Sequence, residues 1–335
     1  MIGVVGAGAM GGALAVQLAR AGHPVTIFAT AYDGPFVSAH LRGEPHPAIG
    51  VPLPGDATIV EPDSWADMLP KAEILVLAVA TAGLVETVQT IAPFASAEAI
   101  WAVATKGWEE ATLRPATAVV GDTLGDHERV VAVVGPSLAT EIAQGVPTAV
   151  VCASRNAHAA AHVARLFGSA RFRTYTSSDI AGVEVGAIVK NVVAIGIGMC
   201  DGLEAAFGVK AMTNAKAFVF SRGLVEMARL ARALGGRPET VLGLAGAGDL
   251  FVTALGGRNA RFGRLVGLGR TPEAALEEMK TTVEGFANAR TLVALADAHG
   301  LDLPVADVVA KVLYYGLPPR EAIERLVSAS VEEEL

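Results

Sequence analysis

The fold is decided by the first eleven residues, Met1-Ile2-Gly3-Val4-Val5-Gly6-Ala7-Gly8-Ala9-Met10-Gly11. The apolar run at residues 2–5 predicts a buried strand, and residues 9–21 predict a helix that ends at a glycine. Between them, three glycines have the spacing G-x-G-x-x-G: Gly6, Gly8 and Gly11. The first permits a tight turn, the second lets a ligand approach the backbone, and the third allows close helix packing. This turn predicts a dinucleotide site at the helix start; the alternative is a glycine-rich turn that binds nothing.

Short apolar runs recur along the first half of the chain and alternate with helical or loop segments. They cover residues 25–29, 74–79, 100–104, 130–134, 149–152 and 172–175. Such alternation predicts an α/β fold with a Rossmann-like doubly wound parallel sheet, which the last two runs extend. After Thr176 helical patterns dominate, at residues 180–200, 214–234, 238–243, 258–268, 272–279, 285–299, 305–314 and 319–328. We therefore expect a dinucleotide-binding domain at residues 1–176 and an all-α C-terminal domain at residues 177–335.

Composition limits the class of protein. Of the 335 residues, 52% are hydrophobic and 18% are charged, which favours large buried cores over disorder. The net charge of -8 provides no basic field for a nucleic-acid backbone, so no nucleic-acid partner is expected. The apolar run at residues 185–200 is too short for a membrane span and contains Lys190 and Asn191. We interpret it as a buried helix and expect no membrane partner.

The cysteines and histidines exclude further classes. Two cysteines, Cys152 and Cys200, cannot form a disulfide framework, so a reducing cytoplasm fits best. The amino terminus lacks the basic region of a signal peptide. His158 and His162 are four residues apart on a predicted helix, but no third ligand is close in sequence, so no metal site is expected.

The end of the second predicted strand bears on the choice between NAD and NADP. An NAD site usually has a carboxylate there, which binds the 2′-hydroxyl of the ribose. Here the strand continues into Ala29-Thr30-Ala31 instead, so we expect NADP to be preferred to NAD, with Thr30 at the cofactor. The alternative stays open because Arg42 is the nearest downstream arginine and Asp33 could be a displaced ribose ligand.

Polar side chains follow two other predicted strands. Lys106 comes after residues 100–104, and Gly135-Pro136-Ser137-Leu138-Ala139 comes after residues 130–134. Open α/β sheets bind ligands at the carboxyl ends of their strands, so we expect both segments to line one crevice. The alternatives are a solvated surface lysine and an ordinary turn.

In the helical part, Lys190 lies in the middle of a helix that is apolar on nearly every side. A buried lysine is costly unless it is paired, and such a lysine can transfer a proton. Asp249, in a glycine-rich corner, could orient its ammonium; the alternative is a core lysine neutralised by a structural carboxylate. Gly256-Gly257-Arg258-Asn259 places a guanidinium and an amide at a predicted helix start, which suits a phosphate or carboxylate, or else a surface helix cap.

Together these motifs resemble those of the NAD(P)-dependent sn-glycerol-3-phosphate dehydrogenases of the bacterial and archaeal type. The shared motifs are residues 6–11, Thr105-Lys106-Gly107, Gly135-Pro136-Ser137 with Glu141 and Pro147-Thr148, Gly182-Val183-Glu184 with Lys190-Asn191-Val192, Gly243-Leu244-Ala245-Gly246 with Gly248-Asp249-Leu250, Arg258-Asn259, and Val283-Glu284-Gly285. They extend over nearly the whole chain. The resemblance implies reduction of dihydroxyacetone phosphate to glycerol 3-phosphate for phospholipid synthesis.

Site residues are carried over by position. The resemblance implies that Lys190 is the general acid/base, with Asp249 beside it as a second catalytic residue. The expected substrate contacts are Lys106, Gly135, Ser137, Lys190, Asp249, Gly257, Arg258 and Asn259. The expected cofactor contacts are Gly6, Gly8, Ala9, Met10, Gly11, Thr30, Lys106, Ala139, Arg258 and Glu284.

The chain departs from the family pattern in three places. Gly257 replaces the serine that commonly precedes Arg-Asn, so one hydroxyl contact with the substrate is lost or replaced. Residues 204–213 form a longer segment without the usual Gly-Asp-Asn pattern, and residues 32–54 lack the common Asn-x-x-Tyr-Leu-Pro motif. These departures affect cofactor preference, effector response and fine substrate choice.

Two other functions are compatible with parts of this pattern. One is a related two-domain dehydrogenase that acts on another small hydroxy acid or 2-keto compound, since one fold serves many substrates. The other is a catalytically silent dinucleotide-sensing module, which would have no need of Lys190, Asp249, Lys106 and Arg258 together. By resemblance, and because two-fold assemblies are common, a homodimer formed through the helical domain is expected.

Overall fold

The structure is a computed structural model that describes residues 1–208 and 212–328. It divides into two compact units. The sheet unit comprises Met1–Glu109 and Arg114–Ile180, and the helical unit comprises Glu110–Leu113 and Ala181–Leu335. The sequence placed the boundary between residues 176 and 177, shortly before this division.

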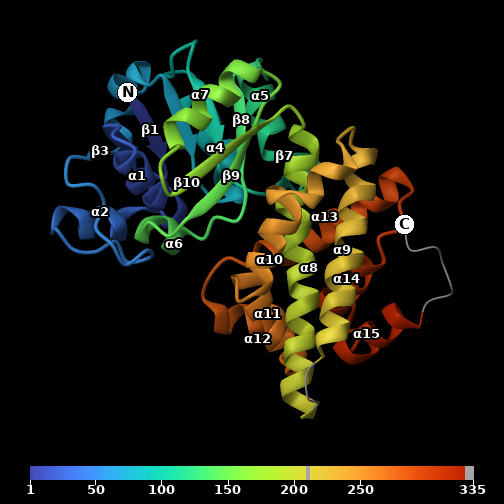
Figure 1. Cartoon of the computed structure of the whole chain (residues 1–335). Coiled ribbons are helices and arrows are strands. Elements are labelled where there is room, and N and C mark those ends of the chain that lie inside the picture. Colours follow the sequence, from blue (N-terminus) through green and yellow to red (C-terminus); the bar gives the residue numbers. More distant parts are fainter. Residues whose placement is uncertain (209–211, 329–335) are drawn as a thin grey trace. The chain divides into compact units, whose positions relative to one another are not determined.

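An eight-stranded sheet organises the sheet unit (Figure 1). Its strands are β1 Ile2–Val5, β2 Val25–Phe28, β3 Thr58–Val60, β4 Ile74–Leu77, β5 Ile100–Val103, β8 Val130–Val134, β9 Thr148–Ala153 and β10 Phe172–Ser177, and their order is β10-β9-β8-β5-β4-β1-β2-β3. The strand order reverses between β1 and β4, which is where open α/β sheets bind ligands. A separate antiparallel hairpin joins β6 Trp108–Glu109 to β7 Arg114–Pro115. The sequence predicted seven strands of the large sheet; β3 and the hairpin strands carried too few apolar residues to be predicted.

One strand pair corrects the expectation of a wholly parallel sheet. β9 runs antiparallel to β8, whereas β10 is again parallel to β9. The connection from β8 to β9 contains only helix α6, Ala139–Gln144, of six residues. Such a helix is about 9 Å long, whereas the five-residue strand β8 is about 17 Å long. The whole connection, residues 135–147, is close to the minimum of about a dozen residues that a parallel crossover needs, and β9 instead enters from the edge at which β8 leaves.

Helices cover both faces of the sheet, which explains its continuous apolar runs. They are α1 Ala9–Arg20, α2 Gly34–Leu41, α3 Trp65–Met68, α4 Thr81–Ile91, α5 Ala116–Leu124, α6 and α7 Ala157–Phe167, with short 3₁₀ turns η1 Pro62–Ser64 and η2 Leu69–Lys71. Within β1, Ile2 and Val4 join the core under α1 and α7, whereas Val5 joins the core under α4 and α5. This alternation is the period of two that a strand imposes on its side chains.

The helical unit is built around α8 Ile180–Phe207, the long yellow-green helix of Figure 1. The others are α9 Thr213–Ala233, α10 Asp249–Ala254, α11 Arg258–Gly267, α12 Pro272–Met279, α13 Glu284–His299, α14 Pro304–Tyr315 and α15 Pro319–Val327, with a 3₁₀ turn η3 Pro238–Leu242 and a π-helical turn η4 Leu244–Gly248. The sequence ended the first helix at residue 200, where the apolar run stops. Ion pairs of Lys216 with Asp201 and Glu204 accompany its last turns.

Close backbone packing buries α8. A Cβ at Gly198 would lie 2.0 Å from the Ala260 oxygen, and one at Gly263 would lie 2.1 Å from the Ile195 oxygen, so α8 and α11 approach at their glycines. By length and hydropathy α8 could cross a membrane, but 89% of its most apolar window is buried within the structure. That burial is typical of a core helix.

Candidate active site

The glycine turn before α1 has the backbone geometry that dinucleotide binding requires. Gly6 has a φ of +93°, which residues with side chains rarely adopt. A Cβ at Gly11 would lie 1.9 Å from the Gly6 oxygen, so the helix packs directly on the turn. At Gly8, in contrast, a Cβ would meet no atom within 4 Å, and Gly8, Ala9 and Met10 are partly exposed. The turn is closed on the sheet side and open at the start of α1, which fits a pyrophosphate.

The carboxylate of Asp33 folds back onto Thr30, which follows the end of β2. One oxygen of Asp33, Oδ2, accepts hydrogen bonds of 2.8 Å from both the backbone N–H and the hydroxyl of Thr30. Asp33 is only 5% exposed. Arg42, the nearest downstream arginine, is paired with Glu44 at the surface. Folding thus places a negative charge where the strand itself carries none.

A buried histidine, which the sequence analysis did not select, contacts the glycine turn. His46 lies between α2 and β3 and is 1% exposed. Its Nε2 is 2.7 Å from the carbonyl oxygen of Ala7. The only sequence signal was the absence of the family's usual motif from residues 32–54, because a single histidine among prolines has no predictive pattern.

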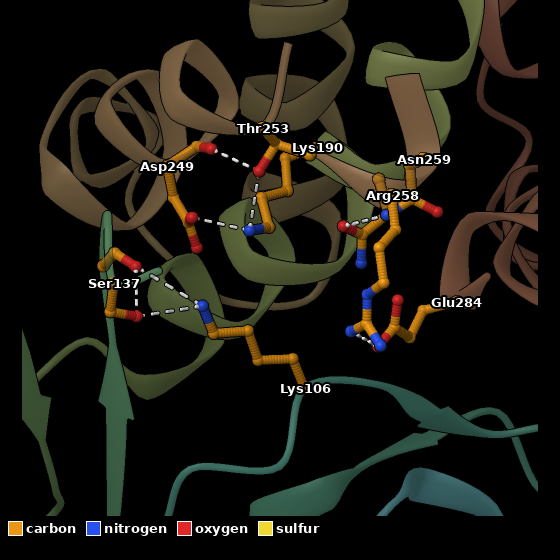
Figure 2. A network of polar contacts seen from close by, with 10 residues as sticks. Lys106, Ser137, Lys190, Asp249, Thr253, Arg258, Asn259 and Glu284 are labelled. Carbon is orange, nitrogen blue, oxygen red and sulfur yellow. Dashed lines mark hydrogen bonds and ion pairs between the residues drawn. The ribbon is translucent and has the colours of Figure 1, made fainter. Parts of the chain in front are cut away.

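Lys106 and Ser137 meet at the carboxyl edge of the sheet, as the sequence predicted from their places after two strands. The Nζ of Lys106 donates to the oxygen of Gly135 at 3.3 Å and to the hydroxyl of Ser137 at 3.5 Å. Ser137 in turn donates to the Gly135 oxygen at 2.8 Å (Figure 2). Gly135 has a φ of +154°, and Ala139 begins α6 shortly after it. The cluster presents an ammonium and a hydroxyl, both suited to an anionic ligand.

The helical unit contains a buried ion pair. The Nζ of Lys190 on α8 lies 2.6 Å from Oδ1 of Asp249 on α10, and the two side chains are 7% and 3% exposed. The ammonium also donates to the hydroxyl of Thr253 at 3.0 Å, and that hydroxyl donates to the Asp249 carbonyl at 2.7 Å (Figure 2). A buried ammonium is stable only with such partners.

Thr253 is the second site residue that the sequence analysis missed. It follows Asp249 by four residues, which places both on one face of α10. That spacing could have revealed it. The six residues of α10, however, are too few to show a helical period in the sequence, so the shared face is evident only in the structure.

An amide row connects three helices beside this pair. Asn259 on α11 is 3% exposed and donates from Nδ2 to Oδ1 of Asn191 at 2.9 Å. Its own Oδ1 accepts the backbone N–H of Gly285 at 2.9 Å. A Cβ at Gly285 would lie 2.7 Å from the Asn191 carbonyl oxygen, so only glycine permits this approach of α13. Asn259 therefore fixes the helices, besides any contact that it makes with a ligand.

The start of α11 carries the remaining predicted residues. Arg258, with its side chain 48% exposed, donates from a guanidinium nitrogen to Oε1 of Glu284 at 2.5 Å. Gly257 precedes it as the N-cap of α11. A Cβ at Gly257 would lie 2.7 Å from the backbone carbonyl oxygen of Thr253, so the serine common at this position could not fit without a backbone shift. Gly257 therefore packs closely on Thr253, where the family commonly has a serine.

The structure therefore gathers the predicted residues into two sets, one in each unit. The sheet unit holds Gly6, Gly8, Ala9, Met10, Gly11, Thr30, Lys106, Gly135, Ser137 and Ala139, and the helical unit holds Lys190, Asp249, Gly257, Arg258, Asn259 and Glu284. Within residues 1–208 and 212–328, no group of three or more metal-ligating side chains comes together. Burial raises the pKa of both Cys152 and Cys200 to about 12, so neither thiol is a reactive thiolate near neutral pH.

Comparison with known proteins covers both units. The family model for the N-terminus of NAD-dependent glycerol-3-phosphate dehydrogenase matches residues 1–160, and that for the C-terminus matches residues 179–324. Proteins named glycerol-3-phosphate dehydrogenase [NAD(P)+] from Stenotrophomonas maltophilia and Symbiobacterium thermophilum are each 38% identical; the alignments cover 99% of this chain and 96% and 95% of theirs. The crystal structure of glycerol-3-phosphate dehydrogenase from Coxiella burnetii is 32% identical with a TM-score of 0.87, over 98% of both chains.

Proposed function

Because the chain belongs to the NAD-dependent glycerol-3-phosphate dehydrogenase family, we propose that it reduces dihydroxyacetone phosphate with NAD(P)H and a proton to sn-glycerol 3-phosphate, reversibly. The observation that carries this proposal is the buried Lys190–Asp249 pair with Thr253 beside it. Side chains needed only for packing would not bring an ammonium, a carboxylate and a hydroxyl together at hydrogen-bond distance in the core.

Lys190 is the proton donor in this proposal. When bound, the reduced cofactor supplies the hydride that the C2 carbonyl carbon accepts. The carbonyl oxygen then gains negative charge, and the ammonium of Lys190 neutralises it by giving up one proton. Asp249, at 2.6 Å, fixes the position of the ammonium, and Thr253, at 3.0 Å, limits its remaining directions. In the reverse reaction, Lys190 accepts the proton from the alcohol.

The substrate phosphate requires cationic and hydroxyl partners. We assign this role to Lys106 and Ser137 and to the half-exposed guanidinium of Arg258. A charge-assisted hydrogen bond to phosphate contributes about 1.5–3 kcal/mol. We assign substrate contacts to these residues together with Gly135, Asn259, Lys190 and Asp249. Gly257 packs on Thr253, so we infer that it supports Thr253 and does not donate a hydrogen bond from a side chain to the substrate.

We assign the cofactor to the turn at residues 6–11, and its further contacts to Thr30, Lys106, Ala139, Arg258 and Glu284. The closed glycines and the open face at Gly8 support this assignment. The contact between Thr30 and Asp33 supports NADH over NADPH, in contrast to the preference that the sequence suggested. The carboxylate of Asp33 repels a 2′-phosphate and already accepts both nearby donors of Thr30.

The assay that tests this function follows the absorbance of NADH and NADPH separately, with dihydroxyacetone phosphate or dihydroxyacetone as substrate. We expect turnover of the phosphate ester and little turnover of dihydroxyacetone, because binding energy from the phosphate is used at the transition state. Equal rates with both substrates would contradict the assignment. No turnover with either cofactor would favour another hydroxy acid or 2-keto substrate. A higher kcat/KM with NADPH than with NADH would contradict the role given to Asp33.

We place the protein in the cytoplasm, where its product supplies glycerophospholipid synthesis, and we expect a homodimer, in line with the prevalence of two-fold assemblies. We propose no nucleic-acid or membrane partner; the net charge of -8 and the buried α8 support this. Light scattering at working concentration tests the dimer, which a monomer mass would exclude.

A further inference from the structure

His46 combines burial with two specific hydrogen bonds. Its side chain sits among α1, α2 and the loop before β3, with 1% exposure. The backbone N–H of Ala48 donates to Nδ1 at 3.1 Å. Nδ1 must therefore be the acceptor nitrogen, and the ring proton resides on Nε2. Nε2–H consequently donates to the carbonyl oxygen of Ala7, 2.7 Å away.

Ala7 is the middle residue of the dinucleotide turn, between Gly6 and Gly8. Its carbonyl and the N–H of Gly8 belong to one planar trans peptide, so they point in opposite directions. Ala7 is fully buried, whereas Gly8 is partly exposed. Holding the Ala7 carbonyl on the buried side thus aims the Gly8 N–H toward the open side, where a pyrophosphate is bound.

The surroundings of His46 fix the ring itself. It stacks on Phe36 of α2, with ring centroids 4.6 Å apart and planes at 7°. On α1, a Cβ at Gly12 would lie 3.1 Å from Nε2, so the missing side chain leaves room for the imidazole. The His46 backbone N–H donates to Val51 and its carbonyl accepts from Gly50, each at 2.9 Å, which closes a tight turn around the residue. Because the imidazole is held on all these sides, its hydrogen bond can fix the orientation of the Ala7 carbonyl.

We propose that His46 is a positioning residue for the cofactor: its Nε2–H holds the Ala7–Gly8 peptide in the orientation that binds the pyrophosphate. This inference rests on the proposed nucleotide-binding function and adds to it a residue outside the glycine turn. Because His46 acts through the peptide alone, its loss affects cofactor affinity and leaves the proton transfer at Lys190 unchanged.

The test compares His46→Leu, His46→Gln and Phe36→Leu in the full chain. Leucine keeps much of the volume and removes both hydrogen bonds, whereas the glutamine Nε2 can reach the Ala7 oxygen. Phe36→Leu disturbs the same packing and keeps the His46 bond, so it is the matched control. NADH and NADPH are titrated separately by fluorescence, and KM for each substrate, kcat and thermal stability are measured.

We expect H46L to raise the cofactor Kd and KM about tenfold, which corresponds to about 1.4 kcal/mol. The KM for dihydroxyacetone phosphate and kcat at saturating cofactor should stay within about twofold, and H46Q should recover most of the affinity. Cofactor affinity unchanged in H46L, or weakened equally in H46L and F36L, would overturn the proposal.

If H46L does not fold, the glutamine variant is compared with His46→Asn instead. Asparagine places its amide at the level of Nδ1 and cannot reach Ala7, so H46Q should bind cofactor more tightly than His46→Asn; equal affinities would contradict the inference. The proposed function fails separately, if the wild-type protein binds neither NADH nor NADPH.

Discussion

The two units hold their lysines in different ways. Lys190 is buried and has a carboxylate partner at 2.6 Å. Lys106 is partly buried, and its bonds to Gly135 and Ser137 are 3.3 and 3.5 Å long. The first arrangement fixes an ammonium at one point, as proton transfer requires, while the second can exchange a backbone carbonyl and a hydroxyl for an anionic ligand. The two lysines therefore need not share a role, and the geometry of their partners distinguishes them.

The largest effect is expected from Lys190→Ala, which removes the buried ammonium. We expect kcat to fall by about 10³-fold, within the range of general acid catalysis, because the alkoxide would lose the proton donor assigned to it. Cofactor affinity should remain near that of the wild type. Steady-state kinetics and an NADH titration measure both. Lys311→Ala, which removes an exposed lysine paired with Asp307, is the matched control. Near-normal turnover in K190A would remove Lys190 from its role.

The other lysine is tested by Lys106→Met, which keeps the aliphatic length and removes the charge. The KM for dihydroxyacetone phosphate should rise about 10- to 100-fold, the equivalent of one charged hydrogen bond. The preference for the phosphate ester over dihydroxyacetone should fall with it. Lys71→Met, at an exposed lysine of the same unit, is the control. If K106M lowers kcat and leaves KM unchanged, Lys106 acts in the chemical step and does not bind the substrate phosphate.

A smaller effect is expected from Thr253→Val, which is nearly isosteric and removes only the hydroxyl. Lys190 would lose one acceptor and keep Asp249, so kcat should fall about tenfold, in line with about 1–2 kcal/mol for one hydrogen bond. Thr253→Ser retains the hydroxyl and should stay within about threefold of the wild type. A valine variant as active as the serine variant would show that Asp249 alone positions the ammonium.

The helical unit also offers a buried carboxylate without a lysine beside it. Glu226 on α9 is 2% exposed, and its oxygens accept the backbone N–H groups of Val305 and Ala306 at the start of α14. Burial raises the pKa of Glu226 to about 8, although the two N–H donors act in the opposite direction. Between the pKa of an unfolded glutamate, about 4.3, and pH 8, the folded state retains a proton that the unfolded state has released.

Folding stability should therefore fall as pH rises through this window, by up to about 1.4 kcal/mol per unit. Glu226→Gln cannot ionise, so the melting temperature of E226Q should depend less on pH between 5 and 8, by a few degrees. Thermal melts of both proteins across that range provide the measurement. Equal pH slopes would show that Glu226 is ionised in the folded protein, and that backbone N–H donors stabilise a buried carboxylate charge much as a lysine stabilises that of Asp249.

Prediction from the sequence succeeded where a local pattern was strong. β1 and β8 begin and end where their apolar runs do, and α12 matches residue for residue. It failed for α10 and the π-helical turn before it, because six residues between glycines carry too little periodicity. The antiparallel entry of β9 was missed as well, since strand direction depends on the length of a connection and not on the strand's own residues.

The glycine turn, the alternation of strands and helices, and the set of polar residues that the family shares can all be recognised in the amino-acid sequence. Tertiary structure alone decided the partners of these residues: Asp249 at Lys190, Asn259 between Asn191 and Gly285, and Asp33 at Thr30. It also decided that His46 reaches Ala7 across 39 residues of sequence. The reason is physical. Helix and strand periods act between near neighbours in the chain, whereas the hydrogen bonds of a buried polar group are set by whichever distant segment packs against it.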